Sequence, residues 1–348
     1  MADVIDWSIA RRVAGVVAGP GPETSPQLRG RVRSDFRELT AVSDELVRSF
    51  TGLAPDEPAP EPVVLDRDGW VRANLDSFAS LVGPLADRLA ESIKPGRIGR
   101  RVTAGAVGVQ LGVLLGYLSK KVLGQYDLVL ATEAGGRVYY VGPNVVEAER
   151  RLHLKPADFR LWIALHEITH RTQFAGVPWL REKVRSLIMR SVDSMELDPE
   201  RLRRVLQRGK DLLLGGPRAW RTADVMTMLM SDEQRELVGE MQALMTVVEG
   251  HGTFVMNRLG RERIPTFERM HQAVENRRHG VGGAERAFQR VIGMEMKLEQ
   301  YSLGERFMNE VADRAGMDTL NKIWDREENL PTLQDLRDTD AWLARIGG

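Results

Sequence analysis

Apolar residues recur at helical spacing along most of this chain. They return every three or four residues from Asp66 to Ile93, and residues 1–50 show a similar helical pattern, broken by the glycines and prolines at 19–22. Another long helical stretch is expected to run to about residue 258, interrupted at Asp198-Pro199 and Gly215-Gly216-Pro217. The pattern therefore predicts a mainly helical protein.

One short region has the signature of strands instead. Leu128-Val129-Leu130 and Val138–Val141 flank a Gly135-Gly136 turn, which predicts a β-hairpin. The fold class expected is thus mainly α, in an α+β arrangement, with a small hairpin or sheet before the next helix. An edge strand at that place could pair with an extended peptide, although the hairpin could equally serve only to cover the core.

The helix that follows is predicted to begin near Pro156 and to stop before Pro178. It carries the run His166-Glu167-Ile168-Thr169-His170, which places two imidazoles on one face with Cβ atoms about 5–6 Å apart. Glu167 lies beside the first imidazole and could take a proton from a zinc-bound water. In a chain with six histidines, the expected number of chance matches to this pattern is on the order of 0.01. A zinc hydrolase site is therefore predicted.

A catalytic zinc needs a third protein ligand and an open position. Glu249 and His251 are the candidates, but two residues apart on a regular helix they point in different directions, so one ligand is expected. We favour Glu249 as the ligand and His251 as a nearby catalytic group. The glycines at 250 and 252 allow several local backbone conformations, so the other assignment stays open. Tyr301 could stabilise an oxyanion, with a core position as the preferred interpretation.

Composition narrows the partners and the compartment. Lysine plus arginine and aspartate plus glutamate both count 49, so no overall field favours nucleic acid, and the basic stretch 201–210 is interpreted as a solvated helix face. The absence of cysteine leaves zinc with histidine, carboxylate or water ligands. The acidic N-terminus lacks a signal-peptide pattern, which predicts a cytoplasmic protein. Val102–Leu118 has glycines at four-residue spacing and is expected to pack as a soluble helix rather than to enter a membrane.

The Pro-rich segment Ala54–Pro60 is interpreted as a solvated connector. It divides the chain into an N-terminal helical arm, residues 1–60, and a single mostly helical domain, residues 61–348. One residue departs from the usual pattern of zinc-peptidase helices, because the charged Arg171 follows the second histidine. We expect Arg171 either to point outward or to restrict the substrate.

Taken together, the motifs resemble those of the zincin-like metallopeptidase type 2 family, over about residues 70 to 325. The segments that carry the resemblance are Gly124–Asp127, Gly142–Asn144, Asp158–Trp162, the His166–His170 run, Val177–Leu180, Glu249–Gly252 and Lys297–Tyr301. Members occur mainly in actinobacteria and chloroflexi, and some are associated with biosynthesis of the deazaflavin coenzyme.

The resemblance implies a zincin-like fold with His166 and His170 as zinc ligands and Glu167 as general base. The resemblance does not supply a substrate. The peptidase-type site predicts a peptide or protein, and the oligomeric state stays open. The alternative is a non-catalytic, zinc-bound scaffold or partner-binding protein linked to deazaflavin coenzyme metabolism. A membrane-associated peptidase that uses residues 102–118 is a third hypothesis.

Overall fold

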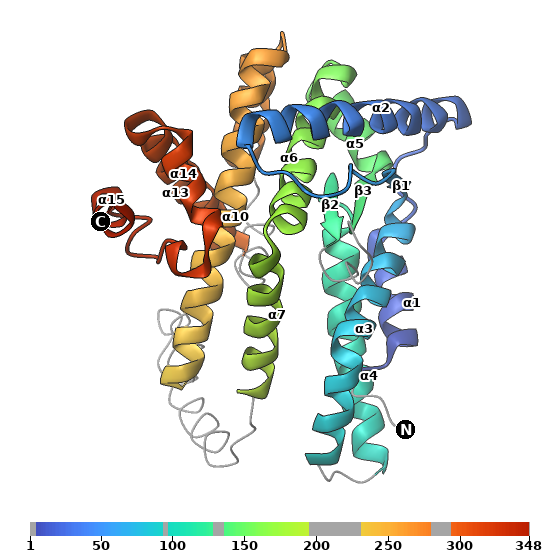
Figure 1. Cartoon of the computed structure of the whole chain (residues 1–348). Coiled ribbons are helices and arrows are strands. Elements are labelled where there is room, and N and C mark those ends of the chain that lie inside the picture. Colours follow the sequence, from blue (N-terminus) through green and yellow to red (C-terminus); the bar gives the residue numbers. More distant parts are fainter. Residues whose placement is uncertain (1–4, 93–96, 128–135, 195–230, 280–293, 348) are drawn as a thin grey trace, which may run out of the picture. The chain divides into compact units, whose positions relative to one another are not determined.

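The computed structural model describes residues 5–92, 97–127, 136–194, 231–279 and 294–347, most of them in helices (Figure 1). The chain splits into two compact units, each of which is described by itself. The first unit contains Met1–Val177 and Gly252–His279, and the second contains Pro178–His251 and Gly280–Gly348. The mainly helical fold with a small sheet that the sequence predicts is confirmed.

The first unit combines seven helices and three strands of its described residues with the end of a long helix, α10, that begins in the second unit. Its helices are α1 (Trp7–Ala18), α2 (Pro26–Thr51), α3 (Arg67–Ser92), α4 (Arg97–Leu118), α5 (Gly142–Arg151), α6 (Pro156–Gly176) and α11 (Phe267–His279). Its strands are β1 (Val63–Leu65), β2 (Gly124–Asp127) and β3 (Arg137–Val141).

The sheet has the strand order β1-β3-β2, with β1 parallel and β2 antiparallel to β3. β3 confirms the second strand predicted for the hairpin, whereas Leu128-Val129-Leu130 of the predicted first strand lies outside the described residues. β2 precedes that segment. β1 was not predicted, because three residues next to a Pro-rich stretch are too few to show an alternating pattern.

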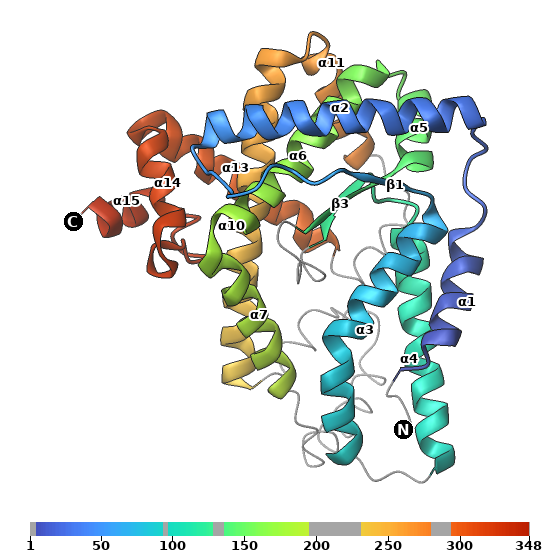
Figure 2. The same ribbon diagram turned by 45° about the vertical axis from the view of Figure 1, so that its right-hand side comes forward.

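The glycine-rich helix α4 packs against α1 through its small residues (Figure 2). A Cβ atom at Gly112 would lie 2.6 Å from the backbone oxygen of Ala10, and one at Gly116 would lie 2.6 Å from that of Ala14. Side chains larger than hydrogen are therefore excluded from this contact. The close helix packing predicted for this segment is confirmed, and no helix in the described ranges combines the length and apolarity needed to span a membrane.

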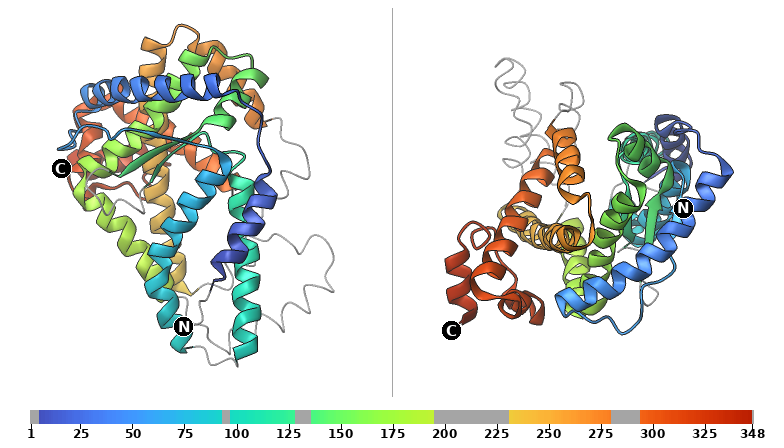
Figure 3. Two further views of the ribbon diagram at one scale, coloured as in Figure 1. Left: turned by 90° about the vertical axis from the view of Figure 1, so that its right-hand side faces the viewer. Right: turned by 90° about the horizontal axis from the view of Figure 1, so that it is seen from above.

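α2 starts at the N-cap Ser25, whose side chain accepts a hydrogen bond from the Leu28 amide, and it runs alongside the sheet and α6 (Figure 3). Phe36 of α2 stacks on Tyr140 of β3 with ring centroids 3.8 Å apart. α2 thus packs on the helix that carries the histidine motif. The domain boundary predicted at residue 60 stays a prediction.

The second unit is built from helices among its described residues. They are α7 (Pro178–Asp193), the first part of α10 (Asp232–Arg263), α13 (Met294–Ala315), α14 (Met317–Asp325), the short 3-10 helix η2 (Glu327–Asn329) and α15 (Thr339–Gly347). α10 and α13 touch where Gly250 meets Gly304 backbone to backbone. The basic stretch 201–210 lies outside the described residues.

Candidate metal centre

α6 presents the two histidines of the motif side by side. The helix begins at Pro156, whose missing N–H costs nothing in the first turn, and it ends at Gly176 before Pro178 starts α7. The Nε2 atoms of His166 and His170 lie 3.2 Å apart, with the rings edge to face. Two nitrogen ligands on one tetrahedral zinc would lie about 3.3 Å apart, given Zn–N distances of about 2.0–2.1 Å. The spacing of the two donors therefore fits a shared metal ion.

A glutamine fixes the orientation of the second histidine. The Nδ1 atom of His170 lies 2.9 Å from Oε1 of Gln173 in a buried position. If Nδ1 carries the proton and donates it to this oxygen, Nε2 is left with the lone pair that a metal needs. This role of Gln173 was not predicted, although its place three residues after His170, on the same helix face, is a signal that could have revealed it.

Replacing Gln173 by leucine should lower zinc affinity by about 10–100-fold, because the imidazole loses the partner that holds its orientation and tautomer. Competition with a chromophoric chelator measures the change. Gln272→Leu, on an exposed position of α11, is the matched control and should leave the affinity unchanged. Equal affinities for the two variants would show that Gln173 does not support the site.

Glu167 lies against the backbone of strand β2. Its side chain is 6% exposed, and a Cβ atom at Gly124 would lie 2.6 Å from both Cγ and Oε1 of Glu167. A side chain at this strand position would therefore displace the carboxylate of Glu167. The pKa of Tyr140 is raised, mainly by burial. The hydrogen bond with Thr40 lowers it, and the negative charge of Glu167 raises it further. The carboxylate thus sits between the histidine helix and the sheet edge.

Gly252 of α10 faces the imidazole pair within the first unit. A Cβ atom there would lie 2.9 Å from Cε1 of His170 and 3.2 Å from Cε1 of His166, so a side chain would collide with the rings. Glu249 precedes Gly252 by one turn of the same continuous helix, and residues three apart share a helix face. The metal-ligating atoms of His166, His170 and Glu249 lie within 4.8 Å of one another, a group that could hold a metal ion.

The other predicted site residues have different surroundings. His251 is fully buried, and its ring meets that of Trp324 edge to face with centroids 5.0 Å apart. Because it lies two residues from Glu249 on a regular helix, it points in a quite different direction. Tyr301 lies in α13, one turn before Gly304, and its side chain lies outside the described residues.

Both expectations for Arg171 are wrong. The side chain is completely buried in the first unit, where Nη1 donates to Oδ1 of Asp44 at 3.0 Å. Nη2 donates to the backbone oxygens of Glu57 and Pro58 in the Pro-rich connector. Burial lowers the pKa of Arg171, and the Asp44 carboxylate opposes that effect. The side chain does not point outward and has no exposed surface to offer a substrate. It ties α6 to α2 and the connector.

A buried helix with two facing histidines and an adjacent carboxylate defines the zincin class of metal site. The family model described as zincin-like metallopeptidase matches residues 5–343, so the chain belongs to this family. A candidate hydrolase with a novel fold from Chloroflexus aurantiacus, known from its crystal structure, is 31% identical. That match covers 99% of both chains with a TM-score of 0.71. A search of the curated proteins finds no match.

Proposed function

We propose that the protein is a zinc-dependent hydrolase that cleaves peptide bonds. His166, His170 and Glu249 would hold the zinc ion and leave a further position open, as catalytic rather than structural zinc sites do. The observation that carries the proposal is the placement of Glu167 beside this group, buried on α6 and pressed against strand β2. A carboxylate in that position is what a zinc hydrolase needs as the base for its water.

Zinc, when bound, would act as a Lewis acid on the scissile carbonyl and make the attacking water more acidic. Glu167 would accept the proton of that water at a carboxylate oxygen and pass it to the leaving nitrogen. Gly124 would keep the carboxylate in place, because its backbone closes one side of the space around Oε1. Gln173 would hold His170 in a single orientation during the reaction.

The edge of β2 that faces away from β3 supports an extended peptide as the substrate. Opposed residues of an antiparallel pair alternate between those that exchange hydrogen bonds and those that do not. The Val141 amide donates to the oxygen of Leu123, so Leu123 and Val141 form a hydrogen-bonded pair. The next pair, Gly124 with Tyr140, is therefore a non-hydrogen-bonded pair. Gly124 and Tyr126 therefore direct their backbone N–H and C=O groups away from β3. No described strand pairs with that edge, so a peptide could add to it beside Glu167.

We assign His251 and Tyr301 supporting roles in the same reaction. His251 is held by Trp324 close in sequence to the proposed ligand Glu249, and a buried imidazole can assist proton transfer. Tyr301 would donate its hydroxyl to the developing oxyanion. The contact of Gly304 with α10 supports this assignment, because it brings α13 against the helix that carries Glu249. We place the activity in the cytoplasm, a reducing compartment that suits a chain without cysteine.

A non-catalytic scaffold linked to deazaflavin coenzyme metabolism remains the second hypothesis. A charged residue such as Arg171 next to the second histidine could favour this hypothesis over catalysis. Because Arg171 is buried against Asp44 and the connector, its charge does not distinguish between catalysis and a structural role.

The proposal is tested by incubating the purified protein with a peptide library and identifying products by mass spectrometry. Cleavage is expected with zinc present, lost after chelation and restored when zinc is returned. A library untouched under all three conditions, from protein that carries its zinc, would contradict the proposed activity and favour the scaffold.

A further inference from the structure

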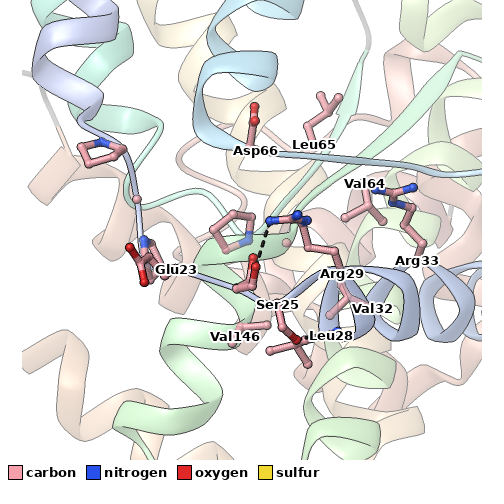
Figure 4. A pocket seen from close by; sticks show the side chains of 16 residues that line it. Glu23, Ser25, Leu28, Arg29, Val32, Arg33, Val64, Leu65, Asp66 and Val146 are labelled. Atoms are coloured by element: carbon pink, nitrogen blue, oxygen red, sulfur yellow. Dashed lines mark hydrogen bonds between the residues drawn. The ribbon is translucent and has the colours of Figure 1, made fainter.

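The first unit contains a cavity of about 820 Å³ that shares no lining residue with the proposed metal centre (Figure 4). It lies between the beginning of α2, the linker before that helix, and the ends of the parallel strands β1 and β3. Its apolar lining is aliphatic throughout and consists of Leu28, Val32, Val64, Leu65 and Val146, together with prolines. A cavity of this size can hold a small organic molecule.

Two arginines of α2, one turn apart, supply the positive charge of the cavity. In Figure 4 the Arg29 guanidinium lies in the middle of the lining residues, and Arg33 lies beside Val64. One nitrogen of Arg29 donates to the backbone oxygen of Thr24 at 2.8 Å, which leaves its other donors available. Neither arginine forms an ion pair with any residue that the structure describes. Guanidinium groups that are not engaged in such an ion pair are suited to bind carboxylate or phosphate oxygens.

Two acidic residues also line the cavity, and neither neutralises the arginine pair directly. Oδ1 of Asp66 accepts the Gly69 amide at 2.7 Å at the start of α3, a position that already favours negative charge. Glu23 lies on the opposite side of Arg29 from Arg33 (Figure 4). An adjoining cavity of about 500 Å³ is lined by charges of both signs, Arg31, Arg150 and Arg160 with Asp35 and Glu149. Arg29 and Arg33 are therefore the cationic groups that the first cavity itself offers to a ligand.

We propose that this cavity binds an organic acid with an aliphatic body. Arg29 and Arg33 would hold the carboxylate or phosphate group, and Leu28, Val32, Val64 and Val146 would cover the chain. Aromatic side chains are missing from the lining, so nothing there would stack on a nucleobase. The site is separate from the proposed peptidase reaction and does not depend on it.

Octanoate and octyl phosphate are suitable probes, with octanol and inorganic phosphate as controls that each lack one half of the ligand. Binding is followed by NMR of the full-length, methyl-labelled protein. We expect the two acids to shift the methyl signals of the aliphatic lining in a saturable way. Octanol and inorganic phosphate should bind at least about tenfold more weakly, because each loses either the charged hydrogen bonds or the apolar contact. Preference for one acid over the other identifies the head group.

Variants separate this cavity from other binding modes. Arg29→Gln with Arg33→Gln should reduce the affinity for the acids at least about tenfold. Arg11→Gln with Arg12→Gln, the same loss of two charges at exposed positions of α1, should not. His166→Ala should leave binding unchanged, which excludes coordination of the acid by the metal centre. Undiminished binding by the double variant, shifts confined to other methyl groups, or equal affinity for octanol would overturn the proposal.

Discussion

Glu167→Gln should lower the rate of peptide hydrolysis by about 10²–10⁴-fold, the contribution typical of a positioned general base. The amide is nearly the same size as the carboxylate, so it fits the space beside Gly124, but it cannot accept a proton. Zinc content and melting temperature should stay at their wild-type values. The loss should therefore appear in kcat measured on a cleaved peptide at saturating zinc.

Glu182→Gln on the exposed face of α7 is the matched control and should retain full activity. If Glu167→Gln hydrolysed the peptide at the wild-type rate, Glu167 would not serve as the base. A variant that loses zinc together with activity would instead indicate a role for Glu167 in holding the site together.

Arg171→Met should destabilise the fold by about 3 kcal/mol, the lower end of the cost of breaking a buried ion pair from one side. The substitution leaves the Asp44 carboxylate buried and removes the donors to the backbone oxygens of Glu57 and Pro58. Arg48 lies 3.6 Å from the same carboxylate and limits the loss. Urea unfolding of the two proteins side by side measures the difference.

Arg37→Met provides the comparison, because the ion pair of Arg37 with Glu61 is exposed on both sides. It should change the free energy of unfolding by no more than about 1 kcal/mol. If Arg171→Met were equally mild, the buried pair would not tie α6 to α2, and the connector would be held by other contacts.

The histidine helix could be predicted closely because its determinants are local. Pro156, Gly176 and Pro178 mark its ends, and the spacing of His166 and His170 alone places two imidazoles on one face. The packing of α4 was predictable for the same kind of reason, since glycines repeated every four residues leave room for a neighbouring helix.

The contacts that complete the site could not be read in the same way, because they join distant parts of the chain. Gly124 is an ordinary glycine in the sequence, and only the fold shows that the Glu167 carboxylate lies against it. Arg171 finds its partner Asp44 127 positions away, so its charge gave no indication that it is buried. Gln173 is the exception, since its hydrogen bond to His170 lies within one helical turn.

The zinc content of the purified protein tests the central claim most directly. Elemental analysis of wild type should give about one zinc per chain, as expected for a single catalytic site. His166→Ala and Glu249→Ala should lose it, and His251→Ala should keep it. Protein that neither contains zinc nor takes it up, or zinc that depends on His251 and survives without Glu249, would contradict the site proposed for this chain.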